Sequence, residues 1–208
     1  MSFSEKASTV RQIFEIMNAV HSVDVSEAEH FASRKAWYNS FDKDASLADI
    51  ERYTTQNIFT AEQGYIICAI LEKFYKSHTG VTPVLNHGDI TMDNLLWHDG
   101  KVVSLLDFEC SVIAPPQLDL HSMTNEFING NQSEQKYIGD IKDLYKSLLS
   151  QDYERDLLLG YAFLFNQRFL EFWLNEPEGE IGQCGAYQNL LSFIDGTGGY
   201  LSELLTEK

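Results

Sequence analysis

Apolar residues near the start of the chain recur with the period of an α-helix. One face of a 3.6-residue repeat carries Val10, Ile13, Phe14, Met17, Val20 and His21. The first 80 residues contain no proline, and the first glycine is Gly64, so residues that interrupt helices are nearly absent. We therefore predict that residues 1–80 form a helical region that opens with an amphipathic helix.

Polar residues mark the expected starts of further helices. Ser26 with Glu29, and Thr60 with Gln63, have the reciprocal spacing of capping boxes. Ser46 is a third candidate N-cap.

Short β-favouring runs replace the helical pattern after Thr82. They predict strands at residues 83–86, 94–97 and 102–106, and Asp99-Gly100 between the last two is typical of a hairpin turn. After Pro115-Pro116 the helical pattern returns, at residues 118–128, 134–149, 154–175 and 184–205, with a break at the glycine-rich residues 196–199. Short strands embedded in helices predict one α+β unit of 208 residues that is mostly helical.

The chain is strongly acidic, with 31 acidic and 15 basic side chains and a formal net charge of −16. This charge repels nucleic acid and anionic membrane surfaces, so we expect neither as a partner. It would also repel ATP unless a divalent cation neutralised the phosphates, whereas it would attract a polycationic substrate. The alternative is that the charge only maintains solubility.

Cysteine spacing and hydropathy exclude several other classes. Cys68, Cys110 and Cys184 show no C-x-x-C spacing, so we expect reduced thiols and neither disulfides nor a zinc site. No run of eighteen apolar residues occurs, and the first residues lack the layout of a signal peptide. We predict a soluble, cytoplasmic protein.

Residues that carry chemistry are concentrated between positions 86 and 120. Their order is H-G-D at 87–89, an asparagine at 94, a hairpin, D-F-E at 107–109 and P-x-x-D-L at 116–120. This order resembles the aminoglycoside phosphotransferase and choline kinase family, distant relatives of the protein kinases.

The resemblance implies the C-terminal lobe of a protein-kinase-like fold, in which a short β-hairpin carries the catalytic and metal-binding residues. Residues 82–120 would form the catalytic loop and hairpin, and residues 121–208 a helical substrate-side region. It also implies Mg²⁺ as cofactor, ATP or GTP as co-substrate, and transfer of the terminal phosphate to a hydroxyl of a small molecule. Aminoglycosides, amino sugars and choline-like alcohols are acceptors of this kind.

Phosphoryl transfer explains why these residue types are needed. Asp89 is the candidate general base, because a loop carboxylate can orient the acceptor hydroxyl and accept its proton. Asn94 and Asp107 are the candidate magnesium ligands, since they offer an amide oxygen and a carboxylate. The alternative for Asp89 and Asn94 is a pair of Asx turns that caps an ordinary loop.

Four further residues would support this site. We expect His87 to fix the catalytic loop by hydrogen bonds, and Gly88 to allow a backbone conformation closed to side chains. Asp119 resembles the aspartate with which the family holds the catalytic-loop backbone, although it could also be an ordinary first-turn helix carboxylate. Glu109 would return to the face of Asp107 on a strand and could reach the outer shell of the metal, or it could be solvated scaffolding.

Two parts of a working kinase cannot be placed in the sequence. A glycine-rich loop and a strand lysine contact the phosphates in kinases, but no glycine precedes Gly64, and Lys6, Lys35 and Lys43 lie in helical or loop sequence. We therefore expect that the amino-terminal lobe is absent from this chain and is encoded upstream or supplied by a second chain. The activity of the chain alone would then be weak or missing.

Candidate substrate-binding residues are less specific. Glu171 and Glu176 could meet the ammonium groups of a cationic substrate, or they could form a solvated acidic face. Aromatic residues crowd the predicted helix 154–175, either as buried packing or as an apolar pocket wall: Tyr161, Phe163, Phe165, Phe169, Phe172 and Trp173.

Two other functions compete with the kinase. One is a catalytically inactive pseudo-kinase lobe that binds a ligand or protein, although carboxylates that face each other without a cation are costly to bury. The other is a metal-dependent hydrolase built on Asp89, Asp107 and histidines. The histidines show no ligand spacing with one another, which disfavours the hydrolase.

Overall fold

The computed structural model describes residues 3–26, 42–126, 151–176 and 179–201. Within these residues the chain is mostly helical and contains two small two-stranded sheets, as the predicted α+β class requires. The chain forms two compact units. The first comprises Met1–Lys35 and Val81–Ser150, and the second comprises Ala36–Gly80 and Gln151–Lys208.

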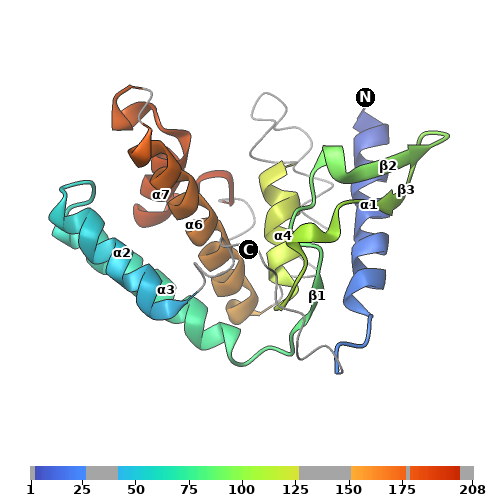
Figure 1. Cartoon of the computed structure of the whole chain (residues 1–208), viewed down its shortest axis with the longest axis horizontal. Coiled ribbons are helices and arrows are strands. Elements are labelled where there is room, and N and C mark those ends of the chain that lie inside the picture. Colours follow the sequence, from blue (N-terminus) through green and yellow to red (C-terminus); the bar gives the residue numbers. More distant parts are fainter. Residues whose placement is uncertain (1–2, 27–41, 127–150, 177–178, 202–208) are drawn as a thin grey trace. The chain divides into compact units, whose positions relative to one another are not determined.

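The first unit combines helix α1, the two sheets and helix α4 (Figure 1). Its elements are α1 (Phe3–His21), β1 (Val84–Asn86), η2 (Met92–Asn94), β2 (Leu95–His98), β3 (Lys101–Leu105), η3 (Phe108–Cys110), β4 (Val112–Ala114) and α4 (Gln117–Thr124). The predicted apolar face of α1 is confirmed, because Val10, Ile13, Phe14 and Met17 are buried. This face packs toward β1 and β3.

Two antiparallel pairings shape the first unit. Strands β2 and β3 form the predicted hairpin, and Asp99 and Gly100 have the positive φ angles that a tight hairpin turn needs, 49° and 73°. Strand β1 pairs with β4, with Asn86 opposite Val112. The sequence analysis missed β4, because three residues are too few to show a β periodicity.

The second unit is helical within the described residues. Its elements are α2 (Lys43–Thr55), α3 (Ala61–His78), α6 (Asp152–Asn175), η6 (Ile181–Gln183), α7 (Gly185–Ile194) and η7 (Gly199–Leu201). The capping box of Thr60 and Gln63 is confirmed at the start of α3. The prediction for Ser46 is wrong: Asp42 caps α2, and the Ser46 hydroxyl lies one turn inside the helix, bonded to the Asp42 carbonyl.

Three other predictions concern residues outside the α-helices and strands above. Glu29 of the first predicted capping box and the helix predicted at 134–149 lie outside the described residues. The break predicted at residues 196–199 is present between α7 and η7, where Gly196 and Gly198 have positive φ angles. Among the described helices, none is long and apolar enough to cross a lipid bilayer.

Candidate active site

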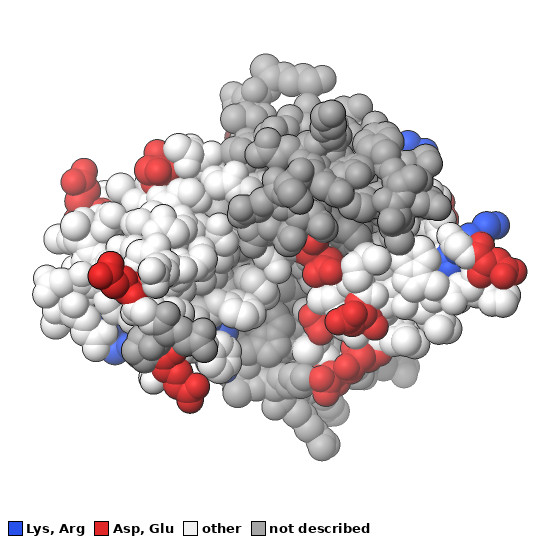
Figure 2. All heavy atoms as spheres, turned by 90° about the horizontal axis from the view of Figure 1, so that it is seen from above, with Lys and Arg blue, Asp and Glu red and all other residues white. Residues whose placement is uncertain are grey.

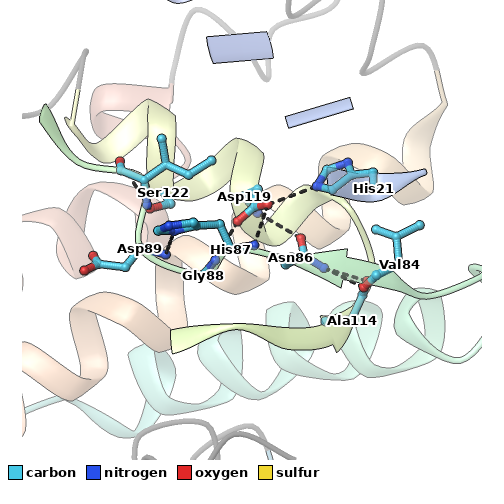
Figure 3. A network of polar contacts seen from close by, with 10 residues as sticks. His21, Val84, Asn86, His87, Gly88, Asp89, Ala114, Asp119 and Ser122 are labelled. Carbon is cyan, nitrogen blue, oxygen red and sulfur yellow. Dashed lines mark hydrogen bonds and ion pairs between the residues drawn. The ribbon is translucent and has the colours of Figure 1, made fainter. Parts of the chain in front are cut away.

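One buried carboxylate holds the loop between β1 and β2 in place. Asp119, in the first turn of α4, accepts hydrogen bonds from the backbone amides of His87 at 2.9 Å and Gly88 at 2.8 Å (Figure 3). His21 Nε2, at the end of α1, lies 3.0 Å from the same carboxylate. Gly88 has a φ of 83°, a conformation that side chains rarely adopt. Three contacts therefore converge on Asp119.

Asn86 fixes the start of α4 to the sheet. Its side-chain nitrogen donates to the Ala114 carbonyl on β4 at 2.8 Å, and its side-chain oxygen accepts from the Asp119 amide at 3.3 Å (Figure 3). Asn86 is fully buried, so these bonds also satisfy its polar atoms. The position of Asp119 is thereby tied to the strand that leads into the loop.

His87 connects the loop to the end of β3. Its Nδ1 accepts a hydrogen bond from the Asp89 amide at 3.3 Å, so the ring hydrogen lies on Nε2, which donates to the Leu106 carbonyl at 2.7 Å. The ring also packs edge to face on Phe108, with centroids 4.6 Å apart. Both ring nitrogens are engaged with the backbone, which suits the loop-fixing role predicted for His87.

Asp89 and Asn94 lie together at the open end of the loop. The Asn94 side-chain nitrogen donates to the Asp89 carboxylate at 3.1 Å and to the Asp89 backbone carbonyl at 2.9 Å. Both partners are acceptors, so the orientation of the amide is determined and its oxygen is turned away from Asp89. The Asp89 carboxylate points away from Asp119 in Figure 3.

Asp107 follows the end of the hairpin that is bonded to Asn94. The Leu106 amide donates to the Asn94 carbonyl at 2.8 Å, so the residue after Leu106 lies beside the candidate amide ligand. Asp107 adopts a left-handed conformation, φ 59° and ψ 68°, and its exposed side chain accepts from the Glu109 amide at 3.4 Å. Backbone strain at a residue without glycine's freedom is common at functional sites.

Glu109 does not lie where the sequence argument assumed. It is in the 3₁₀ turn Phe108–Cys110 and not on a strand, so the alternation that would return it to the face of Asp107 does not apply. Its role as an outer-shell metal ligand stays a prediction.

Two residues with oxygen atoms suited to magnesium flank this end of the hairpin, Asn94 just before β2 and Asp107 two residues after β3. Asn94 offers an amide oxygen and Asp107 a carboxylate, the hard ligands that Mg²⁺ prefers. Across the described ranges, no three His, Cys, Asp or Glu side chains form a group that could hold a metal ion by themselves. Mg²⁺ commonly takes one or two protein ligands and completes its shell with phosphate oxygens and water.

The sequence analysis missed an apolar surface beside these ligands. Leu95 and Leu105 pair across the hairpin and face the core, so the alternation of a strand turns Leu96 and Leu106 to the opposite face. Leu96 and Leu106 are 46% and 42% exposed.

The analysis also missed the residues that hold the loop from other elements. They are His21 on α1, and Ser122 and Glu126, which lie three and seven positions after Asp119. The i, i+3, i+7 spacing on a predicted helix was the available signal for the last two.

In the second unit, Glu171 is already engaged. Its carboxylate accepts from Arg52 and from the Tyr53 hydroxyl, both at 2.6 Å. Partial burial acts to raise the pKa of Glu171, but these hydrogen bonds and the charges of Arg52 and Arg168 together outweigh it, and the pKa lies below its ordinary value. Glu176 is exposed at the C-cap of α6.

The aromatic residues of α6 differ in burial, and the predicted packing role is confirmed for some of them. Tyr161 and Phe163 are buried, whereas Phe169 and Phe172 are 50% and 57% exposed.

On the surface shown in Figure 2, acidic side chains are more widespread than basic ones.

Solved structures of aminoglycoside phosphotransferases resemble the chain in fold. A thermostable mutant of aminoglycoside phosphotransferase APH(4)-Ia matches in its apo form with a TM-score of 0.61 and 13% identity. An aspartate-to-alanine variant of that mutant, in a ternary complex with ADP and hygromycin B, matches with a TM-score of 0.62 and 14% identity. In both, the match covers 96% of this chain and 68% of that chain.

The streptomycin-ATP-APH(2")-IIa ternary complex matches with a TM-score of 0.53 and 13% identity, over 100% of this chain and 66% of that chain. At these identities the likeness shows the fold alone, which is that of kinase-like aminoglycoside phosphotransferases. No curated protein matches the chain.

A family model described as the phosphotransferase enzyme family matches residues 1–157, which include every residue of the loop and hairpin discussed above. Since the match spans 157 of the 208 residues, the chain belongs to the phosphotransferase enzyme family.

Proposed function

We propose that this chain is the larger part of a small-molecule kinase. It would transfer the terminal phosphate of ATP or GTP to a hydroxyl of a small molecule such as an aminoglycoside, an amino sugar or a choline-like alcohol. The observation that carries the proposal is the direct contact between the Asp89 and Asn94 side chains, beside the strand end that leads to Asp107. Similar folds that hold ADP with hygromycin B, or ATP with streptomycin, support it.

Asp89 would orient the acceptor hydroxyl and accept its proton as the oxygen attacks the phosphate. Its carboxylate is partly exposed, and the loop that carries it is held by Asp119 and His87. A base fixed in this way can keep a hydroxyl in line with the phosphate, which supplies much of the rate enhancement in phosphoryl transfer.

Asn94 and Asp107 would hold Mg²⁺, which neutralises charge on the phosphate oxygens when it is bound. The hydrogen bonds that Asn94 donates to Asp89 leave its amide oxygen available as a ligand. The same bonds connect the metal ligand to the base, so the two functions share one rigid support.

The exposed Leu96 and Leu106 would contact the nucleotide base. Leu96 lies two residues after Asn94, and the Leu106 amide donates to the Asn94 carbonyl, so both are close to this candidate ligand in the chain or by a backbone bond. An apolar surface next to the phosphate ligands suits a planar ring. The hairpin would then contact both the base and, through the metal ion, the phosphates of the nucleotide.

The chain spans about two thirds of the length of the solved structures it resembles, 68% and 66% of the chains above. A glycine-rich loop and a strand lysine, which cover the phosphates in kinases, would come from a segment encoded upstream or from a second chain. Turnover by this chain should rise when such a lobe is added.

Calorimetry with magnesium and ATP or GTP tests the proposal on the full chain. We expect Asp107→Ala to weaken binding of the magnesium nucleotide. We expect Asp89→Ala to lower turnover by roughly 10²-fold or more while binding persists. Asp93→Ala is a matched control, because Asp93 is an exposed aspartate of the same loop. Equal small effects of all three substitutions, or no binding of either nucleotide together with binding of a protein partner, would contradict the proposal.

A further inference from the structure

One face of α4 and of the helical turn that follows it contacts the loop after β1 at three successive levels. The first level is Asp119, described above. At the second level the Ser122 hydroxyl oxygen accepts a hydrogen bond from the Ile90 amide at 2.8 Å. At the third, a carboxylate oxygen of Glu126 accepts from the Met92 amide at 3.2 Å. The loop is therefore bound along most of its length, and not only at its first residues.

Helix geometry explains why one element can do this. Positions i, i+3 and i+7 lie on one face of a helix, and Asp119, Ser122 and Glu126 have this spacing. Glu126 lies in a wider helical turn that directly follows α4. The three side chains accept from the amides of His87, Gly88, Ile90 and Met92, none of which belongs to a strand ladder.

Burial limits how far the loop can move without these contacts. The Ile90 side chain is completely buried, and the Ser122 side chain is partly buried. The Ser122 hydroxyl also lies 3.5 Å from the Ile90 carbonyl, so one side chain faces both polar groups of that residue. A local opening at Ile90 therefore exposes an apolar side chain and breaks at least one hydrogen bond.

We propose that Ser122 and Glu126 are positioning residues of the phosphoryl-transfer site, Ser122 acting through Asp89 and Glu126 acting through Asn94. The proposal rests on the proposed function for the roles of those two residues. The Ser122 contact is made one residue after Asp89, so it fixes the backbone of the candidate base. The Glu126 contact is made two residues before Asn94, at the start of the turn that presents the candidate metal ligand.

The two contacts should be distinguishable by the strength of each hydrogen bond and by the loop residue whose amide it holds. A neutral hydrogen bond such as that of Ser122 shifts a local equilibrium by roughly two- to tenfold, and one to a carboxylate by roughly tenfold or more. Removing the Ser122 hydroxyl should therefore loosen Ile90 modestly. Removing the Glu126 carboxylate should loosen Met92 more strongly and weaken the binding of the metal ion.

Amide hydrogen exchange, followed by NMR on the full chain, tests the contacts directly. We expect Ser122→Ala to raise exchange at Ile90 by roughly two- to tenfold, and Glu126→Met to raise exchange at Met92 by roughly tenfold or more. Glu126→Gln should restore most of the protection, because its side-chain oxygen can still accept. Thr124→Val is a matched control: Thr124 donates to the Leu120 carbonyl within α4 and not to the loop.

Calorimetry with magnesium-ATP, the second measurement, distinguishes a positioning role from a structural one. We expect Glu126→Met to weaken binding by roughly tenfold, and Glu126→Gln to bind close to wild type. Turnover should fall in Ser122→Ala, because the backbone beside Asp89 is released.

Unchanged exchange at Ile90 and Met92 would overturn the proposal. So would equal losses in Glu126→Gln, Glu126→Met and Thr124→Val, since that pattern means general weakening of α4. Failure of the wild-type chain to bind magnesium-ATP would instead overturn the proposed function and the positioning role that rests on it. The exchange experiment would still decide whether the two contacts exist.

Discussion

The buried Asp119 carboxylate is the contact whose removal should cost the first unit most. It accepts from the His87 and Gly88 amides and from His21 Nε2, at 2.8 to 3.0 Å. In Asp119→Ala these donors lose their acceptor while the surrounding backbone stays buried. Water cannot replace the acceptor unless the loop opens, and opening would also displace Asp89.

The magnitude follows from the cost of leaving buried donors without partners. Each such donor costs about 1–3 kcal/mol, so the two amides alone account for about 2–6 kcal/mol. Whole domains are stable by only about 5–15 kcal/mol, so the loss is a large share of the total. For a chain of this size about 2–4 °C is lost per kcal/mol, which gives a fall in Tm of about 4–24 °C.

Thermal unfolding followed by circular dichroism measures this loss. Asp93→Ala removes an exposed carboxylate from the same loop and should change Tm by about 2 °C or less, because surface substitutions usually cost within about 0.5 kcal/mol. Asp119→Asn should fall between the two, since it keeps one acceptor oxygen and turns an NH₂ group toward a donor. If Asp119→Ala unfolds like Asp93→Ala, the hydrogen bonds to Asp119 do not hold the loop.

Two further predictions concern pH and packing. Burial lowers the pKa of His121 to about 3, so near pH 6.5 the unfolded chain binds a proton at this residue and the folded chain does not. The free energy of unfolding is therefore unaffected by this proton above that pH and falls as the pH drops toward 3. Urea denaturation at a series of pH values should show a slope of up to about 1.4 kcal/mol per pH unit, and His121→Gln should make this slope smaller. A methyl group at Gly160 would overlap the Phe74 side chain, so Gly160→Ala should cost about 1–3 kcal/mol in the same assay.

Each of these has its own control. An added Cβ at Gly185 meets nothing within 4 Å, so Gly185→Ala should cost much less than Gly160→Ala. Equal costs would mean that the close packing at Gly160 is not the cause. For the pH effect, an unchanged slope in His121→Gln would show that other groups titrate in this range.

The parts of the fold that sequence predicted are those with a long or chemically specific local pattern. The amphipathic face of α1 repeats over several turns, and Asp99-Gly100 offers the two residues that tolerate positive φ. Strand β4 is three residues long and follows no period of its own, because its pairing with β1 decides its conformation. Ser46 failed as a cap since several polar residues near it can cap, and the structure uses Asp42.

The candidate site was predictable as far as the family motif carries the spacing of its residues, which includes Asp119. The spacing of Asp89 and Asn94 is short enough for the motif to carry it, and the hairpin adds Asp107. His21 is 98 residues from Asp119 and lies on a face that also packs apolar residues, so no local pattern separates it from the core. The strand position assumed for Glu109 is wrong for a different reason: β3 ends at Leu105, and Glu109 lies in the 3₁₀ turn that follows. Its role at the metal stays a prediction.

Charge shows most clearly why composition cannot identify a binding residue. The chain has an excess of acidic side chains, which made Glu171 and Glu176 equal candidates for a cationic substrate. In the folded second unit, however, Arg52 and Tyr53 already donate to Glu171, and its lowered pKa reflects that stabilisation of its charged form. An ammonium group at Glu171 would meet a carboxylate whose charge Arg52 already balances, whereas the exposed Glu176 makes no such ion pair with the described residues of the second unit. The excess of negative charge would therefore attract a cation over a long range, whereas the pairing of each carboxylate decides where the cation can bind.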